Sequence, residues 1–135
     1  MSRVLIVEDE DFLIRTLEDN LTTEGYTVDI ARNGDEAIKK IGKKKPDLVL
    51  LDILMPKRDG FSVLEAIKKD PERKLIPVIV LSNLGEDMTI KRALEAGADD
   101  FFVKSQHTIQ EIVEKVKDYF EGRKATKGHP SKPTK

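Results

Sequence analysis

Hydrophobic and polar positions follow two different periods along the chain. Five short runs are rich in Val, Ile, Leu and Phe, and they cover residues 3–7, 26–31, 47–53, 77–81 and 99–103. Short runs of this composition are typical of strands. Two of them, 4–7 and 48–51, contain no polar residue, which is expected of strands that are covered on both faces. The pattern therefore predicts five strands, at least two of them fully buried.

The segments between these runs carry apolar residues every three or four positions, which predicts helices. The residues expected to face the core are Phe12, Ile14, Leu17 and Leu21; Ala37, Ile38 and Ile41; Phe61, Leu64 and Ile67; Ile90, Ala93 and Leu94; and Ile109, Ile112, Val113, Val116 and Phe120. Gly25 and Gly97 stand where a helix ends in a left-handed residue. Thr108 and Glu111 have the spacing of a capping box that starts the last helix.

Strand and helix alternate with no room for hairpins. Consecutive strands must therefore be joined by crossovers and lie parallel, with helices on both faces of the sheet. The sequence predicts a single α/β domain of the doubly wound (βα)5 class, with a five-stranded parallel sheet.

Chemically active side chains follow four of the five predicted strands. In sheets of this class, ligands bind outside the carboxyl ends of the strands. Acidic residues 8–11 follow the first strand, Asp52 ends the third, Ser82 follows the fourth and Lys104 follows the fifth. A charged residue at one strand end is common, but reactive groups at four strand ends indicate a functional site.

The acidic residues 8–11 restrict what this site binds. A nucleotide or flavin site presents glycines and backbone N–H groups at the first turn, whereas four carboxylates there repel phosphate. Clustered oxygen ligands without nitrogen or sulfur suit Mg²⁺ or Mn²⁺. A cation and Lys104 would keep Asp52 ionised inside its apolar run, and an ionised, oriented carboxylate is a nucleophile toward phosphoryl groups. Asp52 is therefore the predicted phosphoacceptor.

Composition limits the chemistry that the chain can perform and its expected cellular location. The chain of 135 residues has no cysteine, which excludes disulfide and thiolate chemistry, and its two histidines, His107 and His129, are too far apart for a helical metal pair. No apolar run approaches the roughly 20 residues that span a bilayer, and no secretory signal is visible. We expect a cytoplasmic protein without a membrane partner.

The net charge of −1 conceals a basic C-terminal segment. Residues 122–135 contain five Lys or Arg and no acid, with Gly, Pro, Ser and Thr between them. This composition predicts a disordered basic tail beyond a domain at residues 1–121. A solubilising tail is the ordinary interpretation, and contact with nucleic acid or an acidic partner is the alternative.

Four segments together resemble the receiver domain of bacterial two-component response regulators, in particular the single-domain, chemotaxis-regulator type. They are VLIVEDE (4–10), LVLLDILMPKRDG (48–60), VIVLSN (78–83) and GADDFFVK (97–104), and the resemblance extends over residues 2–121. It implies a flavodoxin-like strand order 2-1-3-4-5. It also implies a phosphorelay switch in which a sensor histidine kinase or phosphotransfer protein phosphorylates Asp52 with the help of Mg²⁺, rather than a turnover enzyme.

The resemblance also assigns roles to residues. It implies that Glu8, Asp9 and Asp52 hold the metal, Asp9 most directly, together with the backbone carbonyl of Leu54. It matches Ser82 to a hydroxyl that moves to the phosphoryl group, Lys104 to the lysine that pairs with that group, and Phe101 to a switch aromatic that turns inward.

We expect a downstream protein partner on the fourth helix, the strand at 99–103 and the last helix, because Ser82 and Phe101 abut these elements. Residues that could supply charge pairs on this surface are Lys91, Arg92, Asp99, Asp100 and Lys115, and a merely solvated face is the alternative. We expect no direct DNA binding, and a monomer that can dimerise when phosphorylated.

Two residues depart from the common family pattern. The switch aromatic is Phe101 where tyrosine is frequent, and Ser105 follows Lys104 where proline is usual. A cis bond to a residue other than proline costs roughly 2.5–4 kcal/mol, so we expect a trans Lys104–Ser105 bond.

Two other kinds of function compete with the receiver. A phosphatase of the haloacid dehalogenase type needs a second Asp two residues after the nucleophile, but that position is Leu54, so its general acid is missing. A flavin-binding module would make the purified protein yellow. The chain is either a stand-alone receiver, which we favour, or a segment of a longer regulator.

Overall fold

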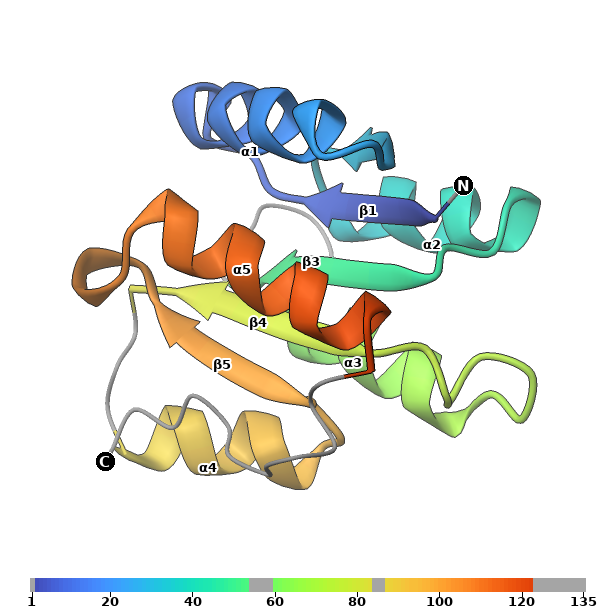
Figure 1. Cartoon of the computed structure of the whole chain (residues 1–135). Helices are drawn as coiled ribbons and strands as arrows, with labels where there is room; N and C mark the ends of the chain where they lie inside the picture. The colour runs from blue at the N-terminus through green and yellow to red at the C-terminus, as the bar shows by residue number, and fades with distance from the viewer. Residues whose placement is uncertain (1, 54–59, 84–86, 123–135) are drawn as a thin grey trace.

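Strands and helices alternate in the computed structural model of the chain, which describes residues 2–53, 60–83 and 87–122 (Figure 1). The strands are β1 (Arg3–Val7), β2 (Thr27–Ala31), β3 (Leu48–Asp52), β4 (Val78–Ser82) and β5 (Asp100–Val103). The helices are α1 (Asp11–Thr23), α2 (Gly34–Lys43), α3 (Gly60–Lys69), α4 (Asp87–Glu95) and α5 (Ile109–Phe120), and a short 3-10 turn, η1 (Lys104–Gln106), precedes α5. All five predicted strands and all five predicted helices are present.

The five strands form one parallel sheet in the order β2-β1-β3-β4-β5. Val7, at the end of β1, is in register with Ala31 of β2 and with Leu51 of β3. Asp52 is in register with Leu81, and Ser82 with Val103. The predicted doubly wound fold and strand order are therefore confirmed, and the carboxyl ends of all strands meet at one edge of the sheet.

Helices cover both faces of the sheet. Leu5 and Val7 face the core beneath α2, α3 and α4, whereas Val4 and Ile6 face the core beneath α1 and α5. In Figure 1, α5 lies in front of the sheet and α3 behind it. Every residue of β3 and β4 is buried, as their apolar sequences predict for central strands.

Two residues predicted to face the core are exposed instead. Phe12 is 72% exposed and Leu94 is 45% exposed. The reason is helical geometry: at 100° per residue, Phe12 lies about 200° from Ile14 around α1, so the two cannot share a face. Leu94 lies one position beyond Ala93, the buried residue of α4, and points to its flank.

The ends of the helices follow the sequence closely. Gly25 and Gly97 have φ angles of 98° and 109°, the left-handed values predicted for them. At the start of α5, the Glu111 N–H donates to Thr108 Oγ1 at 3.1 Å and the Thr108 N–H donates to Glu111 Oε1 at 2.8 Å. The predicted capping box is thus confirmed. None of the helices in the described part of the chain has the length and apolar character to traverse a lipid bilayer.

Candidate functional site

The candidate site is built from the ends of β1, β3, β4 and β5. Glu8 follows β1, and its N–H donates to Ala31 O at 3.0 Å, which extends the pairing with β2 and fixes the backbone. Asp52 is the last residue of β3 and Ser82 the last of β4, and both are buried. Because the strands are parallel, the residues that the sequence analysis selected reach the same edge of the sheet.

Three carboxylates converge there, and we call Glu8, Asp9 and Asp52 the acidic trio. Each contributes an oxygen, and these oxygens lie within 4.8 Å of one another. Glu8 and Asp52 are buried while Asp9 is exposed, so the group opens to solvent on one side. An all-oxygen donor set with an open side fits Mg²⁺ or Mn²⁺, which keep several water ligands.

Lys104 closes the other side of the acidic trio. Its Nζ lies 2.9 Å from Glu8 Oε1, 3.1 Å from Glu8 Oε2 and 3.4 Å from Asp52 Oδ2. The contact with Glu8 Oε2 has hydrogen-bond geometry, whereas Glu8 Oε1 is held by the ion pair with Lys104 and accepts no hydrogen bond from the described residues. Burial acts to lower the pKa of Lys104, but its hydrogen bond with Glu8 and the charge of Asp52 outweigh this and raise the pKa above its ordinary value.

The backbone at Lys104 agrees with the sequence analysis. The Lys104–Ser105 peptide bond is trans, as expected for serine in place of proline. Lys104 begins the turn η1, and its side chain is only 15% exposed. A trans bond therefore still allows the lysine to reach both buried acids.

Gly60 is a positioning residue to which the sequence analysis gave no role. Its N–H donates to Ile53 O at 2.8 Å, so α3 starts directly against the residue that follows Asp52. A Cβ at this position would lie 2.4 Å from Ile53 Cα and 2.5 Å from Asp52 O. Only glycine permits this approach. In the sequence, the Asp59–Gly60 pair was the only sign of a special backbone position here. Its separation from Asp52 along the chain did not reveal how closely the two backbones approach.

Phe101 is already inside the fold. It lies in β5, is 1% exposed and belongs to the core beneath α3 and α4. The Phe101 side chain was expected to turn inward on phosphorylation, but in this structure it already points inward. A phenylalanine lacks the hydroxyl that would favour a solvent-facing tyrosine, which accounts for the burial.

The charged residues predicted for the partner surface mostly make contacts within the fold. Asp100 is 2% exposed, with Lys115 Nζ 3.6 Å from its Oδ2. Asp99 Oδ2 accepts hydrogen bonds from Val78 N and Lys68 Nζ. These internal contacts could not be read from charge alone.

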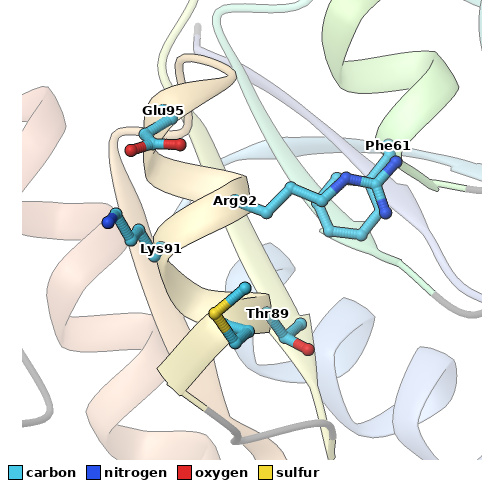
Figure 2. Close-up of a pocket in the computed structure, with 6 residues that line it drawn as sticks. Phe61, Thr89, Lys91, Arg92 and Glu95 are labelled. Atoms are coloured by element: carbon cyan, nitrogen blue, oxygen red, sulfur yellow. The ribbon is translucent and has the colours of Figure 1, made fainter.

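Arg92 also turns toward the fold. Its guanidinium lies 3.7 Å from the centre of the Phe61 ring, a cation–π contact between α4 and α3 (Figure 2). The two residues line a hollow of about 460 Å³ together with Met88, Thr89, Lys91 and Glu95. Because α3 follows Asp52 and α4 follows Ser82 in the chain, this contact joins the two helices that come after these site residues.

Two parts of the predicted organisation lie outside the described residues. The carbonyl of Leu54, the expected fourth protein ligand of the metal, is one of them. Residues 123–135, nearly all of the predicted tail, are the other.

Comparison with known proteins identifies the fold and the family. The family model for the response regulator receiver domain matches residues 4–117. The probable transcriptional regulator ycf27 of Pyropia yezoensis is 43% identical over 102 residues, which cover 76% of this chain and 41% of that protein. The signal receiver domain of a signal transduction histidine kinase from Syntrophus aciditrophicus has a TM-score of 0.83 and 35% identity, over 96% of this chain and 97% of that one.

A third similar protein was solved with a metal. The Mn²⁺-bound form of response regulator Rcp1 has a TM-score of 0.80 and 27% identity, and the match covers 89% of this chain and 94% of that one. The chain spans less than half the length of the curated relatives described as transcriptional regulators. The residues matched by the family model include the acidic trio, Ser82 and Lys104. The chain therefore belongs to the response regulator receiver family of two-component signalling.

Proposed function

We propose that this receiver accepts a phosphoryl group on Asp52 from the phosphohistidine of a histidine kinase or a phosphotransfer protein, in a reaction that requires Mg²⁺ or Mn²⁺. The observation that carries the proposal is the arrangement around Asp52. A buried carboxylate at a strand end stands beside two further acids and a lysine whose Nζ is 3.4 Å from Asp52 Oδ2. The similarity to Mn²⁺-bound Rcp1 supports the choice of metal.

Each side chain has a distinct task in this reaction. An Asp52 oxygen forms the bond to phosphorus while the bond from phosphorus to the donor imidazole nitrogen breaks, and the electron pair leaves with the imidazole. Lys104 pairs with the negative oxygens of the transferring group. Glu8 and Asp9 would hold the cation, which when bound neutralises charge on the same oxygens. Ser82, at the end of the neighbouring strand β4, would donate its hydroxyl to the phosphoryl group.

The product is an aspartyl phosphate that acts as a signal. Repeated hydrolysis of external phosphate esters would need a general acid two residues after Asp52, where the chain has Leu54. We therefore assign the chain only its own phosphorylation and dephosphorylation, in the cytoplasm, within a domain at residues 1–121. Its output would be a changed α4-β5-α5 surface that a downstream protein recognises, because Phe101 lies in β5 and Ser82 ends the neighbouring strand β4.

Intact mass spectrometry tests this proposal. With acetyl phosphate and Mg²⁺, the mass of the native chain should increase by one phosphoryl group, and the mass of Asp52→Asn should not. Glu10→Gln, in the exposed acidic turn beside the acidic trio, is the matched control and should be phosphorylated like the native chain. Phosphorylation that persists in Asp52→Asn would reject Asp52 as the acceptor.

A further inference from the structure

A strongly basic surface lies at the end of the molecule opposite the acidic trio. The end of α2 and the connector between α3 and β4 lie at the amino ends of the strands, whereas the acidic trio lies at their carboxyl ends (Figure 1). We call this surface the basic end, and it comprises Lys43, Lys44, Lys45, Lys69 and Lys74. All five lysines are exposed, and within the described part of the chain none forms an ion pair, although the pKa of Asp70, lowered mainly by a hydrogen bond from the Glu72 N–H, is lowered further by the charge of Lys45.

A hollow in the basic end has room for an anionic group. It has a volume of about 550 Å³ and is lined by Ile41, Gly42, Lys43, Lys45, Glu72 and Arg73. Three of these six residues are cationic and one is acidic. Arg73 is already paired with Asp70, so Lys43 and Lys45 are the cations left to meet an anion.

An apolar side chain projects from the same surface. Leu75 is 87% exposed, and it directly follows Lys74. Its neighbours are held in place: Lys68 Nζ donates to Lys74 O at 3.1 Å and to Ile76 O at 2.7 Å, and Ile76 is buried. The fold therefore holds Leu75 outward from a fixed backbone, next to lysines.

From this combination we propose that the basic end binds the surface of an anionic lipid bilayer, with lysines on the headgroups, one lipid phosphate at the hollow and Leu75 in the apolar boundary. Lysines gain from a negative lipid surface, and an exposed leucine gains from the acyl region. Nucleic acid suits the surface less well. Segments 39–45 and 68–76 contain no aromatic residue for base stacking, and their one arginine is paired with Asp70.

This contact is peripheral, so it is compatible with the lack of a spanning helix among the described residues. The expectation of no membrane partner in the sequence analysis rested only on the lack of an apolar spanning run. Bilayer contact through the basic end directs the acidic trio away from the lipid. The phosphorylation site would then stay open to a protein donor while the receiver is bound at the surface.

Vesicle co-sedimentation of the full chain tests the proposal. The native chain should bind phosphatidylcholine vesicles that contain phosphatidylglycerol, more weakly at high salt, and should not bind phosphatidylcholine alone. Each lysine near an anionic surface contributes about fivefold in affinity, so Lys43→Gln/Lys45→Gln/Lys74→Gln should weaken binding on the order of 100-fold. The matched control Lys124→Gln/Lys127→Gln/Lys132→Gln removes the same charge from the C-terminal segment and should keep the native affinity.

Two single variants separate the apolar from the electrostatic contribution. Leu75→Ser leaves the charge unchanged and should weaken vesicle binding, whereas Glu72→Gln removes the acid at the hollow and should strengthen it. Equal loss in the two triple variants would assign the binding to the C-terminal segment and overturn the proposal. Unchanged binding of Leu75→Ser, or a DNA duplex that binds the chain more tightly than the vesicles, would overturn it as well.

Discussion

The charge balance around Asp52 decides what single substitutions do at the site. Asp52 ends the apolar run of β3, where every residue is buried, and among the described residues Lys104 lies 3.4 Å from it as a compensating charge. The same lysine is closer to Glu8, at 2.9 Å. One ammonium group therefore serves two buried carboxylates, while the exposed Asp9 adds a third negative charge. A divalent cation held by the acidic trio would restore the balance.

Asp9→Asn should weaken Mg²⁺ binding more than Glu8→Gln does. Both Glu8 oxygens lie within ion-pair distance of Lys104, so a cation must compete with the lysine for them, whereas Asp9 is exposed and open to the ion. The measurement is a Mg²⁺ titration followed by backbone NMR shifts. Glu10→Gln removes an acid from the same turn but outside the acidic trio, and should leave the affinity unchanged. Equal losses for Asp9→Asn and Glu8→Gln would contradict the distinction.

Gly60→Ala should destabilise the fold by about 1–3 kcal/mol, the usual range for overpacking, and should slow phosphorylation of Asp52. The new Cβ would meet backbone atoms of Ile53 and Asp52, which no side-chain rotation can relieve. Urea unfolding and intact mass measured over time test the two effects. Gly42→Ala is the matched control: nothing lies within 4 Å of its Cβ, and alanine stabilises a helix by up to about 1 kcal/mol relative to glycine. A Gly60→Ala protein as stable as Gly42→Ala would refute this positioning role.

At the scale of elements, the sequence predicted helix ends better than helix faces. Gly25, Gly97 and the Thr108–Glu111 capping box rely on local backbone chemistry, which acts over a few residues and is visible in the sequence. The face that a helix buries depends on the tertiary contacts around it. Phe12 and Leu94 were assigned to the core because they are apolar, yet both are exposed.

Thr108→Ala should lower the free energy of unfolding by about 1 kcal/mol, the typical cost of losing an N-cap side chain. The hydroxyl accepts the Glu111 N–H, and alanine leaves that donor at the helix start without its partner. Urea unfolding at neutral pH gives the measurement. Thr22→Ala makes the same chemical change at an exposed position of α1 and should have little effect. A loss in Thr22→Ala as large as in Thr108→Ala would show that the cap is not the cause.

The capping box should also depend on pH. The hydrogen bond from the Thr108 N–H to the Glu111 carboxylate lowers the pKa of Glu111 below its ordinary value. Stabilisation by this carboxylate is therefore complete above the ordinary pKa of glutamate and is lost as the pH falls through the lowered pKa. The stability difference between the native chain and Glu111→Gln should accordingly shrink in acid. A difference that grows as the pH falls would contradict the sign.

At the scale of the whole molecule, the candidate site was predictable because it depends on topology. Parallel strands bring their carboxyl ends together, so Glu8, Asp52, Ser82 and Lys104 could be grouped before any distance was known. Contacts between side chains from distant segments were not predictable in this way. The burial of Phe101, the pairing of Lys115 with Asp100 and the stacking of Arg92 on Phe61 each depend on packing geometry that residue type alone does not give.

If the acidic trio holds Mg²⁺ as proposed, Asp52 should couple the stability of the whole domain to metal binding. Without a cation, Asp52→Asn should make the fold more stable by on the order of 1–2 kcal/mol, because it removes a buried carboxylate that is repelled by Glu8 and Asp9, while Lys104 keeps its closer contact with Glu8. Mg²⁺ at about 100 times its Kd should stabilise the native chain by roughly 2.7 kcal/mol, since it binds the folded state. The Asn variant should gain much less at the same Mg²⁺ concentration, because one ligand of the acidic trio is gone. Urea unfolding of both proteins, with Mg²⁺ and with EDTA, gives all four values. An Asn variant that is less stable than the native chain in EDTA would show that Asp52 contributes to folding, and would contradict the view that its charge is kept for phosphorylation at the expense of stability.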